Sequence, residues 1–234
     1  MSTGPKTARF RFSAISRRAA MTGAALAAMG TLAACGGSDG GQAAQGDMAK
    51  GAPEGAKVTV VEYASVTCGA CAGWQEQVWP EFKAKYVDTN QVRFIFREFP
   101  TPPADVAAAG FLLARCAGED RYFEVVEEIM ASQREWGQGI PPAATLSRIA
   151  TSVGLSEEEY RTCVTDPEAL AALEGRIQSA RSEGVTATPT FFVNGTRVPN
   201  SCTMMSPRPA GNHSSTVWVC WRAKASIPMS AAPT

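Results

Sequence analysis

Residues 58–71 read Val-Thr-Val-Val-Glu-Tyr-Ala-Ser-Val-Thr-Cys-Gly-Ala-Cys. The first seven are mostly β-branched and apolar without clean alternation, which is typical of a central strand covered on both faces. Beyond them, large apolar residues recur at every fourth position: Trp74, Val78, Phe82 and Tyr86. This spacing indicates one apolar face of a helix, and Pro80 within it should kink that helix. The stretch therefore predicts a strand, a short loop, two cysteines three residues apart, and a helix.

Cys68 and Cys71 stand at the predicted first turn of that helix. The unpaired N–H groups and the positive dipole end there stabilise a thiolate, so Cys68 is the expected nucleophile. Cys71 lies one turn further in and is the expected resolving thiol, because the helix shields it. A Cys-x-x-Cys pair is also half of a zinc site, but there is no second pair and the single histidine, His213, is distant. We predict a redox pair that needs no metal and no cofactor.

A second motif, at residues 186–195, reads Thr-Ala-Thr-Pro-Thr-Phe-Phe-Val-Asn-Gly. Pro189 cannot donate to a sheet ladder, so its place before an apolar run predicts an edge strand or a cis turn. Asn194 and Gly195 predict a type I′ hairpin turn. With a further apolar strand at residues 94–100, the sequence resembles the DsbA-like branch of the thioredoxin superfamily over residues 58–198.

That resemblance implies an α/β, thioredoxin-like fold with an inserted all-helical lobe. It also implies that Thr188 and Pro189 form the cis-proline loop that faces Cys68, and that Glu62 is the buried acid that accepts a proton from Cys71. Burial of a carboxyl beneath the cysteines would raise its pKa toward neutrality. The alternative for Glu62 is a solvent-exposed glutamate on an edge strand.

The residues between the two cysteines depart from the strongly oxidising members of the family. Those carry Pro-His there, whereas this sequence has Gly69-Ala70. Alanine neither donates a hydrogen bond nor carries charge, so we expect a less stabilised Cys68 thiolate and a less oxidising disulfide. The sequence leaves open whether the protein acts as an oxidant, an isomerase or a reductant.

Residues 103–184 are expected to form the helical insertion, between two parts of the thioredoxin-like domain at 57–102 and 185–200. Three-to-four spacing predicts helices over 104–117, 121–132, 143–153, 156–165 and 167–183. Cys116 and Cys163 fall on two of them, 47 positions apart. In an oxidising compartment we favour a structural disulfide worth ~4 kcal/mol, and the alternative is two buried free thiols.

The N-terminus predicts export to the periplasm or cell envelope. Residues 1–34 have a basic start and an apolar stretch, as in a signal peptide, and the Leu-Ala-Ala-Cys string ending at Cys35 resembles the lipobox of lipoproteins. Residues 35–56 are rich in Gly, Ala, Ser and Gln and predict a flexible tether. No apolar run is long enough to span a bilayer, so membrane contact is expected through a lipid on Cys35 alone. The formal net charge is zero, which argues against nucleic acid as a partner.

Residues 201–234 do not fit the family pattern, which ends in an amphipathic helix. This tail has four prolines, no helical period and an apolar cluster around Trp218. Reading the codons of residues 202–205 in the neighbouring frame allows an acidic string like the start of the missing helix. We therefore hypothesise a frameshift near Ser201, which resequencing of the gene would test.

These features together predict an exported thiol:disulfide oxidoreductase that acts on envelope proteins through Cys68 and Cys71. The resemblance also implies a membrane redox partner that restores the cysteine pair. Two alternatives are a glutathione-dependent transferase or isomerase on a related fold, and a non-catalytic lipoprotein that binds peptides along the edge at Thr188. The cysteine pair argues against the first, whose chemistry needs one nucleophile and a glutathione pocket.

Overall fold

The computed structural model describes Met1, Ala44 and residues 46–199. Residues 2–34 of the predicted signal peptide, the predicted lipidation site Cys35 and the tail at 201–234 lie outside the described residues. Of the helices that are described, none combines the length and apolarity needed to cross a membrane.

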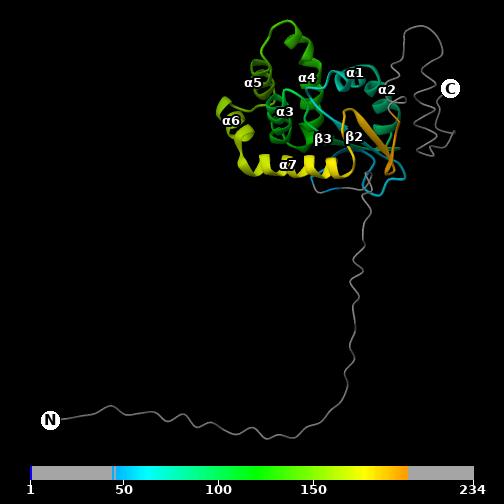
Figure 1. The fold of residues 1–234 in the computed structure, drawn as a ribbon, viewed down its shortest axis with the longest axis horizontal. Helices are drawn as coiled ribbons and strands as arrows, with labels where there is room; N and C mark the ends of the chain where they lie inside the picture. The colour runs from blue at the N-terminus through cyan, green and yellow to red at the C-terminus, as the bar shows by residue number, and fades with distance from the viewer. Residues whose placement is uncertain (2–43, 45, 200–234) are drawn as a thin grey trace. The chain divides into compact units, whose positions relative to one another are not determined.

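A five-stranded mixed sheet forms the centre of the domain, in the order β1-β3-β2-β4-β5 (Figure 1). β2 and β3 are parallel, and the other neighbours are antiparallel. β2 is central, and its side chains from Val60 to Ala64 are buried on both faces, as the lack of alternation predicts. The strands are β1 (Met48–Gly51), β2 (Thr59–Ala64), β3 (Arg93–Glu98), β4 (Thr190–Val193) and β5 (Thr196–Arg197).

The helix after β2 is interrupted, as Pro80 predicts. α1 (Gly69–Gln77) ends before Val78, and α2 (Trp79–Phe82) continues into a π-helical turn, η1 (Lys83–Val87). The four apolar residues of the predicted face are buried in the main core. This core lies between one face of the sheet and helices, whereas a smaller one on the other face joins Val61 and Ile95 to the end of α7.

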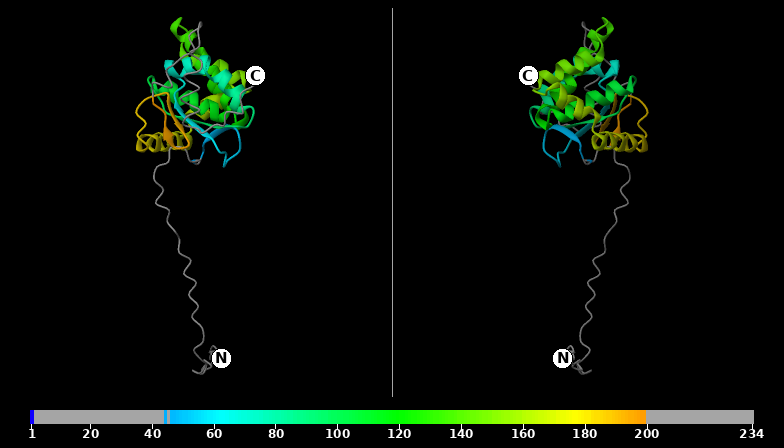
Figure 2. Two further views of the ribbon diagram at one scale, coloured as in Figure 1. Left: turned by 90° about the vertical axis from the view of Figure 1, so that its right-hand side faces the viewer. Right: turned by 90° about the vertical axis from the view of Figure 1, so that its left-hand side faces the viewer.

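All five helices predicted for the insertion are present and precede β4. They form the helical lobe, and the last of them returns to the sheet, where it packs against β3 (Figure 1). Figure 2 shows this helix, in yellow, beside the orange strands β4 and β5. The five are α3 (Ala104–Cys116), α4 (Glu119–Gly137), α5 (Pro142–Ser152), α6 (Glu157–Thr165) and α7 (Pro167–Ser182).

The prediction of a flexible tether over residues 35–56 is wrong for its last part. β1 pairs with β3 there, with Met48 opposite Phe96. Just before it, the carboxylate of Asp47 accepts two hydrogen bonds of 2.9 Å from the guanidinium of Arg97. A strand is held by its backbone hydrogen bonds, so a segment poor in large apolar residues can pair when a partner edge is available.

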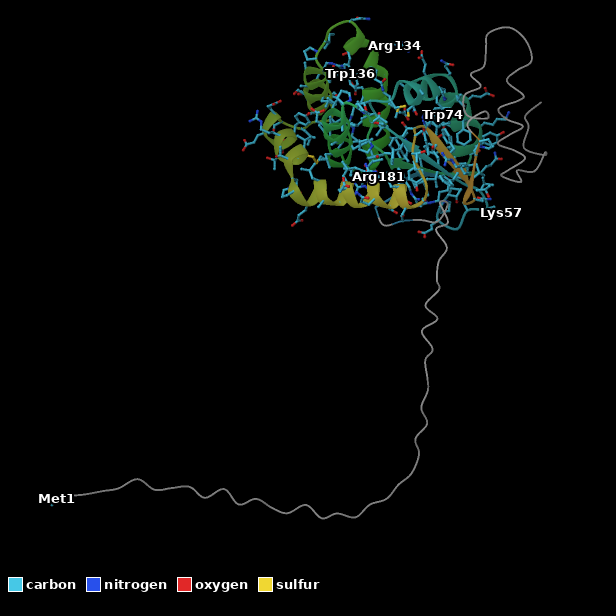
Figure 3. All side chains as sticks on the ribbon, viewed as in Figure 1. Met1, Lys57, Trp74, Arg134, Trp136 and Arg181 are labelled. Carbon is cyan, nitrogen blue, oxygen red and sulfur yellow. A yellow bond between two sulfur atoms is a disulfide. The ribbon has the colours of Figure 1, made fainter. Side chains whose placement is uncertain are left out.

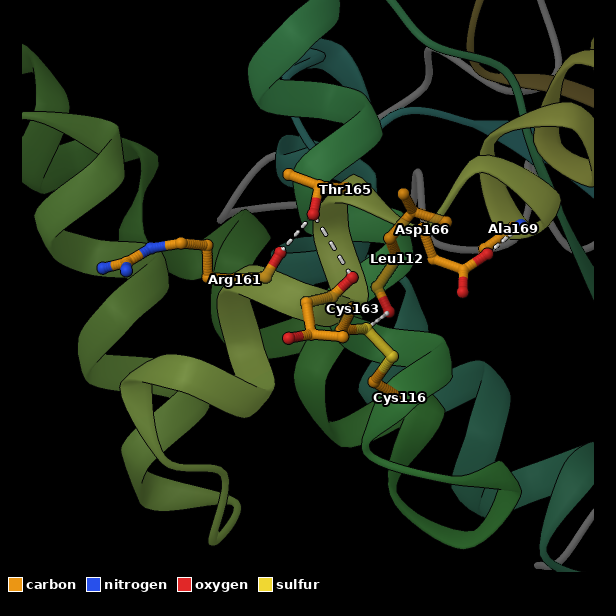
Figure 4. The surroundings of a disulfide bond; sticks show 8 residues. Leu112, Cys116, Arg161, Cys163, Thr165, Asp166 and Ala169 are labelled. Carbon is orange, nitrogen blue, oxygen red and sulfur yellow. Dashed lines mark hydrogen bonds between the residues drawn. A yellow bond between two sulfur atoms is a disulfide. The ribbon is translucent and has the colours of Figure 1, made fainter.

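A disulfide between Cys116 and Cys163 joins α3 to α6 within the lobe (Figure 4). Their Cα atoms are 6.4 Å apart, within the range that a disulfide spans. The Cys163 sulfur also lies 3.3 Å from the carbonyl oxygen of Leu112. The bridge closes a long loop of the chain and so restricts the unfolded lobe.

Glu98, at the end of β3, ties the sheet to the lobe. Its carboxylate is buried and accepts hydrogen bonds from Arg115 of α3 at 2.6 Å and Arg176 of α7 at 2.5 Å. The hydroxyl of Tyr122, on α4, donates to the same carboxylate at 3.1 Å. Three helices of the lobe therefore meet at one buried charge.

Candidate active site

The two cysteines of the first motif lie at the beginning of α1, as predicted. Cys68 is the N-cap residue with an extended backbone, and its Sγ accepts a hydrogen bond from the N–H of Cys71 at 3.2 Å. Both thiols are free, but Cys71 is fully buried while Cys68 is partly exposed. An incoming sulfur can therefore reach Cys68 only.

The thiols have pKa values shifted in opposite directions. Hydrogen bonding with the Cys71 thiol lowers the pKa of Cys68 from 9.0 to about 6, helped by Thr188 and by the N–H groups of Cys71 and Ala70. Desolvation raises the pKa of Cys71 well above its ordinary value, and the Cys68 thiol and Glu62 raise it further. The exposed sulfur is therefore the thiolate near neutral pH, and the buried one holds its proton.

The loop of the second motif faces Cys68. The peptide bond between Thr188 and Pro189 is cis, and the carbonyl oxygen of Thr188 lies 3.5 Å from the Cys68 sulfur. Pro189 is buried, whereas Thr186 and Ala187 beside it are exposed. Within the described residues, the N–H of Thr188 has no hydrogen-bond partner, so this backbone can pair with an extended peptide.

Glu62 is buried in the central strand and is not the solvent-exposed edge residue of the alternative. It is 1% exposed, and its Oε2 atom has no hydrogen-bond partner among the described residues. Burial raises its pKa well above the ordinary value, and the nearby Cys68 charge raises it further. The structure thus places a carboxyl that favours its protonated form close to the redox pair.

A hydroxyl network braces the loop that carries Cys68. Thr67 Oγ1 donates to the carbonyl of Thr101 at 2.8 Å, and the N–H of Thr101 donates to Ser65 Oγ at 3.1 Å. Ser65 and Thr67 also share a hydrogen bond of 2.9 Å. The sequence carries no signal for this network, because Thr101 is more than thirty residues from its partners.

A cavity of about 490 Å³ lies beside the cysteine pair, between α1 and α4. Gly69 and Gly73 line it on α1, and Met130 and Arg134 line it on α4. An ion pair between Glu76 and Arg134 crosses it, and Figure 3 shows Arg134 projecting from α4. In the part of the chain that the structure describes, no group of three His, Cys, Asp or Glu side chains could hold a metal ion.

Comparison with known proteins agrees with this arrangement. A family model described as thioredoxin matches residues 43–206. The chain belongs to this thioredoxin family. The match begins before β1, in agreement with the correction of the tether, and residues 207–234 lie outside it.

Solved structures, a DsbA protein among them, share the fold of this thioredoxin-family chain. α-DsbA1 of Wolbachia pipientis superposes with a TM-score of 0.64 at 23% identity, covering 81% of this chain and 94% of that protein. BdbD of Bacillus subtilis gives a TM-score of 0.52 at 18% identity, covering 80% of this chain and 96% of that protein. The expected thioredoxin-like fold with an inserted helical lobe is therefore confirmed.

Among curated proteins, a Rickettsia conorii protein whose name assigns it to the protein-disulfide oxidoreductases is 36% identical over 145 residues. The aligned region covers 61% of this chain and 52% of that protein. The chain thus spans about half the length of the curated relatives it matches.

Proposed function

We propose that this chain is an exported thiol:disulfide oxidoreductase that exchanges disulfides with envelope proteins through Cys68 and Cys71. One observation carries the proposal. A partly exposed sulfur with a pKa of about 6 stands at a helix N-terminus, one turn from a buried thiol and opposite a cis-proline loop. The names of the curated relatives support the same reaction class.

In the oxidising direction, a client thiolate attacks Cys68 of the Cys68–Cys71 disulfide. A mixed disulfide forms and the Cys71 sulfur leaves as a thiolate. A second client thiolate then attacks the client's own sulfur in the mixed disulfide, so that Cys68 leaves as a thiolate and the client gains a disulfide. The reducing direction runs these steps in reverse and needs no other group.

Glu62 would serve this cycle by exchanging a proton with Cys71. A thiolate buried as deeply as Cys71 is costly, so its formation is easier if a proton arrives as the bond breaks. A buried carboxyl whose pKa is raised by burial holds a proton close to neutral pH. The backbone of Thr188 would hold the client segment in extended form beside Cys68.

The reduction potential would lie between those of the strong oxidants and of thioredoxin. The pKa of about 6 for Cys68 falls between values of ~3.5 for DsbA and ~7 for thioredoxin. A less stabilised thiolate makes the reduced form less favoured, and the disulfide correspondingly less oxidising.

Export and lipid anchoring at Cys35 belong to the same proposal. The basic start, the apolar stretch and the small residues before Cys35 support them. The disulfide between Cys116 and Cys163 fits an oxidising compartment. A membrane redox partner would meet the tethered domain at a raised effective concentration.

The test compares the full chain with its Cys68→Ser and Cys71→Ser variants in oxidation of a reduced model protein and in reduction of insulin. Wild type should catalyse at least one of these, and Cys68→Ser neither. Cys71→Ser should instead accumulate a mixed disulfide with the client, visible as an added mass. The double variant Cys116→Ala/Cys163→Ala is the matched control and should remain active. Undiminished activity of Cys68→Ser would refute the assignment of the nucleophile.

A further inference from the structure

Gln133 of α4 joins the helical lobe to the loop before α1 by side-chain hydrogen bonds. Its Nε2 donates hydrogen bonds to the carbonyl oxygens of Val66 at 2.8 Å and Cys68 at 3.3 Å. A methyl group added at Gly69 would lie 3.9 Å from Gln133 Oε1, so the amide also borders the residue after the nucleophile. One lobe residue therefore touches the loop on both sides of the Cys68 sulfur.

The hydroxyl network of Ser65, Thr67 and Thr101 holds one side of this turn, and Gln133 binds the two carbonyls from the side of the lobe. The Cys68 carbonyl also accepts the N–H of Ala72 at 3.0 Å, which is the first hydrogen bond of α1. The N–H of Cys71, which donates to the Cys68 sulfur, lies in the same turn. An amide bound to both carbonyls fixes the orientation of the turn, because each hydrogen bond loses strength steeply when its angle opens.

We propose that Gln133 is a positioning residue of the redox site: it holds the Val66–Cys68 turn so that the N–H groups of α1 point at the nucleophilic sulfur. The helical insertion thereby sets the reactivity of a cysteine that belongs to the thioredoxin-like part. The inference deepens the proposed disulfide exchange and depends on it for its biological meaning.

The charge distribution around the turn supports this role. One of the two carbonyls belongs to Cys68 itself and the other lies two residues before it, and a donated N–H offsets the partial negative charge of each oxygen. Without the amide, the turn loses this anchor and the partial negative charge of both oxygens is left uncompensated. Both changes disfavour the ionised sulfur and favour the thiol.

The experiment uses full-length Gln133→Met, which keeps the side-chain length and removes both donors, and Gln133→Glu, which turns a carboxylate toward the two oxygens. The control is Gln138→Met, at the exposed end of the same helix. The readout is the pH midpoint of Cys68 alkylation by iodoacetamide, together with the potential of the Cys68–Cys71 couple in glutathione buffers.

Gln133→Met should move the midpoint up by about one pH unit, so that the thiolate fraction at pH 6 falls about fivefold. Gln133→Glu should move it further in the same direction, and both variants should make the couple more reducing. A residue that only stabilised the fold would lower the melting temperature and leave the midpoint in place.

The inference is overturned if Gln133→Met and Gln138→Met alkylate with the midpoint of wild type. That result would leave the proposed function standing, provided that wild type exchanges disulfides. If wild type alkylates as expected but exchanges no disulfides, the proposed function fails, and the Gln133 variants still decide whether the lobe controls Cys68.

Discussion

Two buried glutamates on adjacent strands, Glu62 of β2 and Glu98 of β3, have opposite surroundings. Each is 1% exposed. Glu98 accepts hydrogen bonds from two guanidinium groups and a tyrosine hydroxyl. Glu62 has a carboxyl oxygen with no partner among the described residues, and burial raises its pKa. The same side chain is thus ion-paired in the lobe contact in one place and has an oxygen without a described partner and a raised pKa in the other.

Two pairs of cysteines show a similar contrast. Cys116 and Cys163 form a disulfide within the lobe, whereas Cys68 and Cys71 are free thiols at a helix start. Stability and reactivity are therefore placed in different parts of the fold. Ion pairs to Glu98 and a disulfide hold the lobe together and to the sheet, whereas two free thiols and a carboxyl oxygen without a described partner lie at the Cys68 site.

The largest expected effect is the loss of the Glu98 carboxylate. Glu98→Ala leaves the guanidinium groups of Arg115 and Arg176 partly buried without their partner, and should cost about 3–5 kcal/mol of unfolding free energy. Urea denaturation measures the loss. Glu128→Ala, which removes one exposed ion pair with Arg148, should cost less than about 1 kcal/mol. Equal losses in the two variants would contradict the role given to Glu98.

Next in size is the effect of the lobe disulfide. Cys116→Ala/Cys163→Ala should lower the unfolding free energy by about 2–4 kcal/mol, because the unfolded chain loses a constraint across 47 positions. Urea denaturation of the oxidised proteins measures the difference. Repeating it in strong reductant should bring wild type close to the variant, and a gap that persists there would mean that packing, not the bridge, is responsible.

Removal of the Glu62 carboxyl should change the rate of disulfide exchange more than the unfolding free energy. Glu62→Gln eliminates proton exchange at Cys71 and should slow disulfide exchange at pH 7 by about 100-fold. The raised pKa means that Glu62 favours folding below its unfolded pKa of 4.5 and loses this contribution as pH rises. The variant should therefore lack that decline in stability with pH.

Stopped-flow exchange with a model client and urea denaturation across pH measure the two effects. Glu183→Gln is a useful control, because Glu183 is also largely buried but has a hydrogen bond of 2.6 Å from Tyr63. It should lower stability and leave the exchange rate within about threefold. A Glu62→Gln enzyme with wild-type rates would remove Glu62 from the mechanism.

The features predicted correctly from the sequence were those encoded within a short segment. The spacing of Cys68 and Cys71, the β-branched run before them and the cis turn at Pro189 each follow from neighbouring residues. The three-to-four spacing of apolar residues predicted the helices of the lobe, because this pattern is also local in the sequence. Four of these helices end within one residue of the prediction, whereas α4, predicted over 121–132, spans Glu119–Gly137.

The features that were missed depend on partners distant in the sequence. β1 has a composition typical of a linker and becomes a strand because β3 offers a free edge. Gln133 is one of many helix glutamines until the fold sets it against Val66 and Cys68. The frameshift hypothesis for residues 201–234 stays a prediction, since those residues are not described.

The pH dependence of stability should also differ between the reduced and the oxidised site. The pKa of Cys68 is lowered from 9.0 to about 6 on folding. A thiol with a lowered pKa stabilises the folded state fully above its unfolded pKa, and this contribution is lost as pH falls through 6. The oxidised protein has no thiol at this position to titrate. The stability of the reduced form relative to the oxidised form should therefore rise between pH 6 and pH 9.

Urea denaturation of both redox forms between pH 6 and pH 9 measures this difference in stability. The experiment is done in the Glu62→Gln variant, which removes a nearby carboxyl that also titrates. Alkylation should give a midpoint near pH 6 for Cys68 and leave Cys71 unmodified, since it is fully buried. A flat difference between the two forms, together with a midpoint near 9, would mean that α1 does not stabilise the thiolate. The contrast between the ion-paired lobe contact and the reactive site would then rest on burial alone.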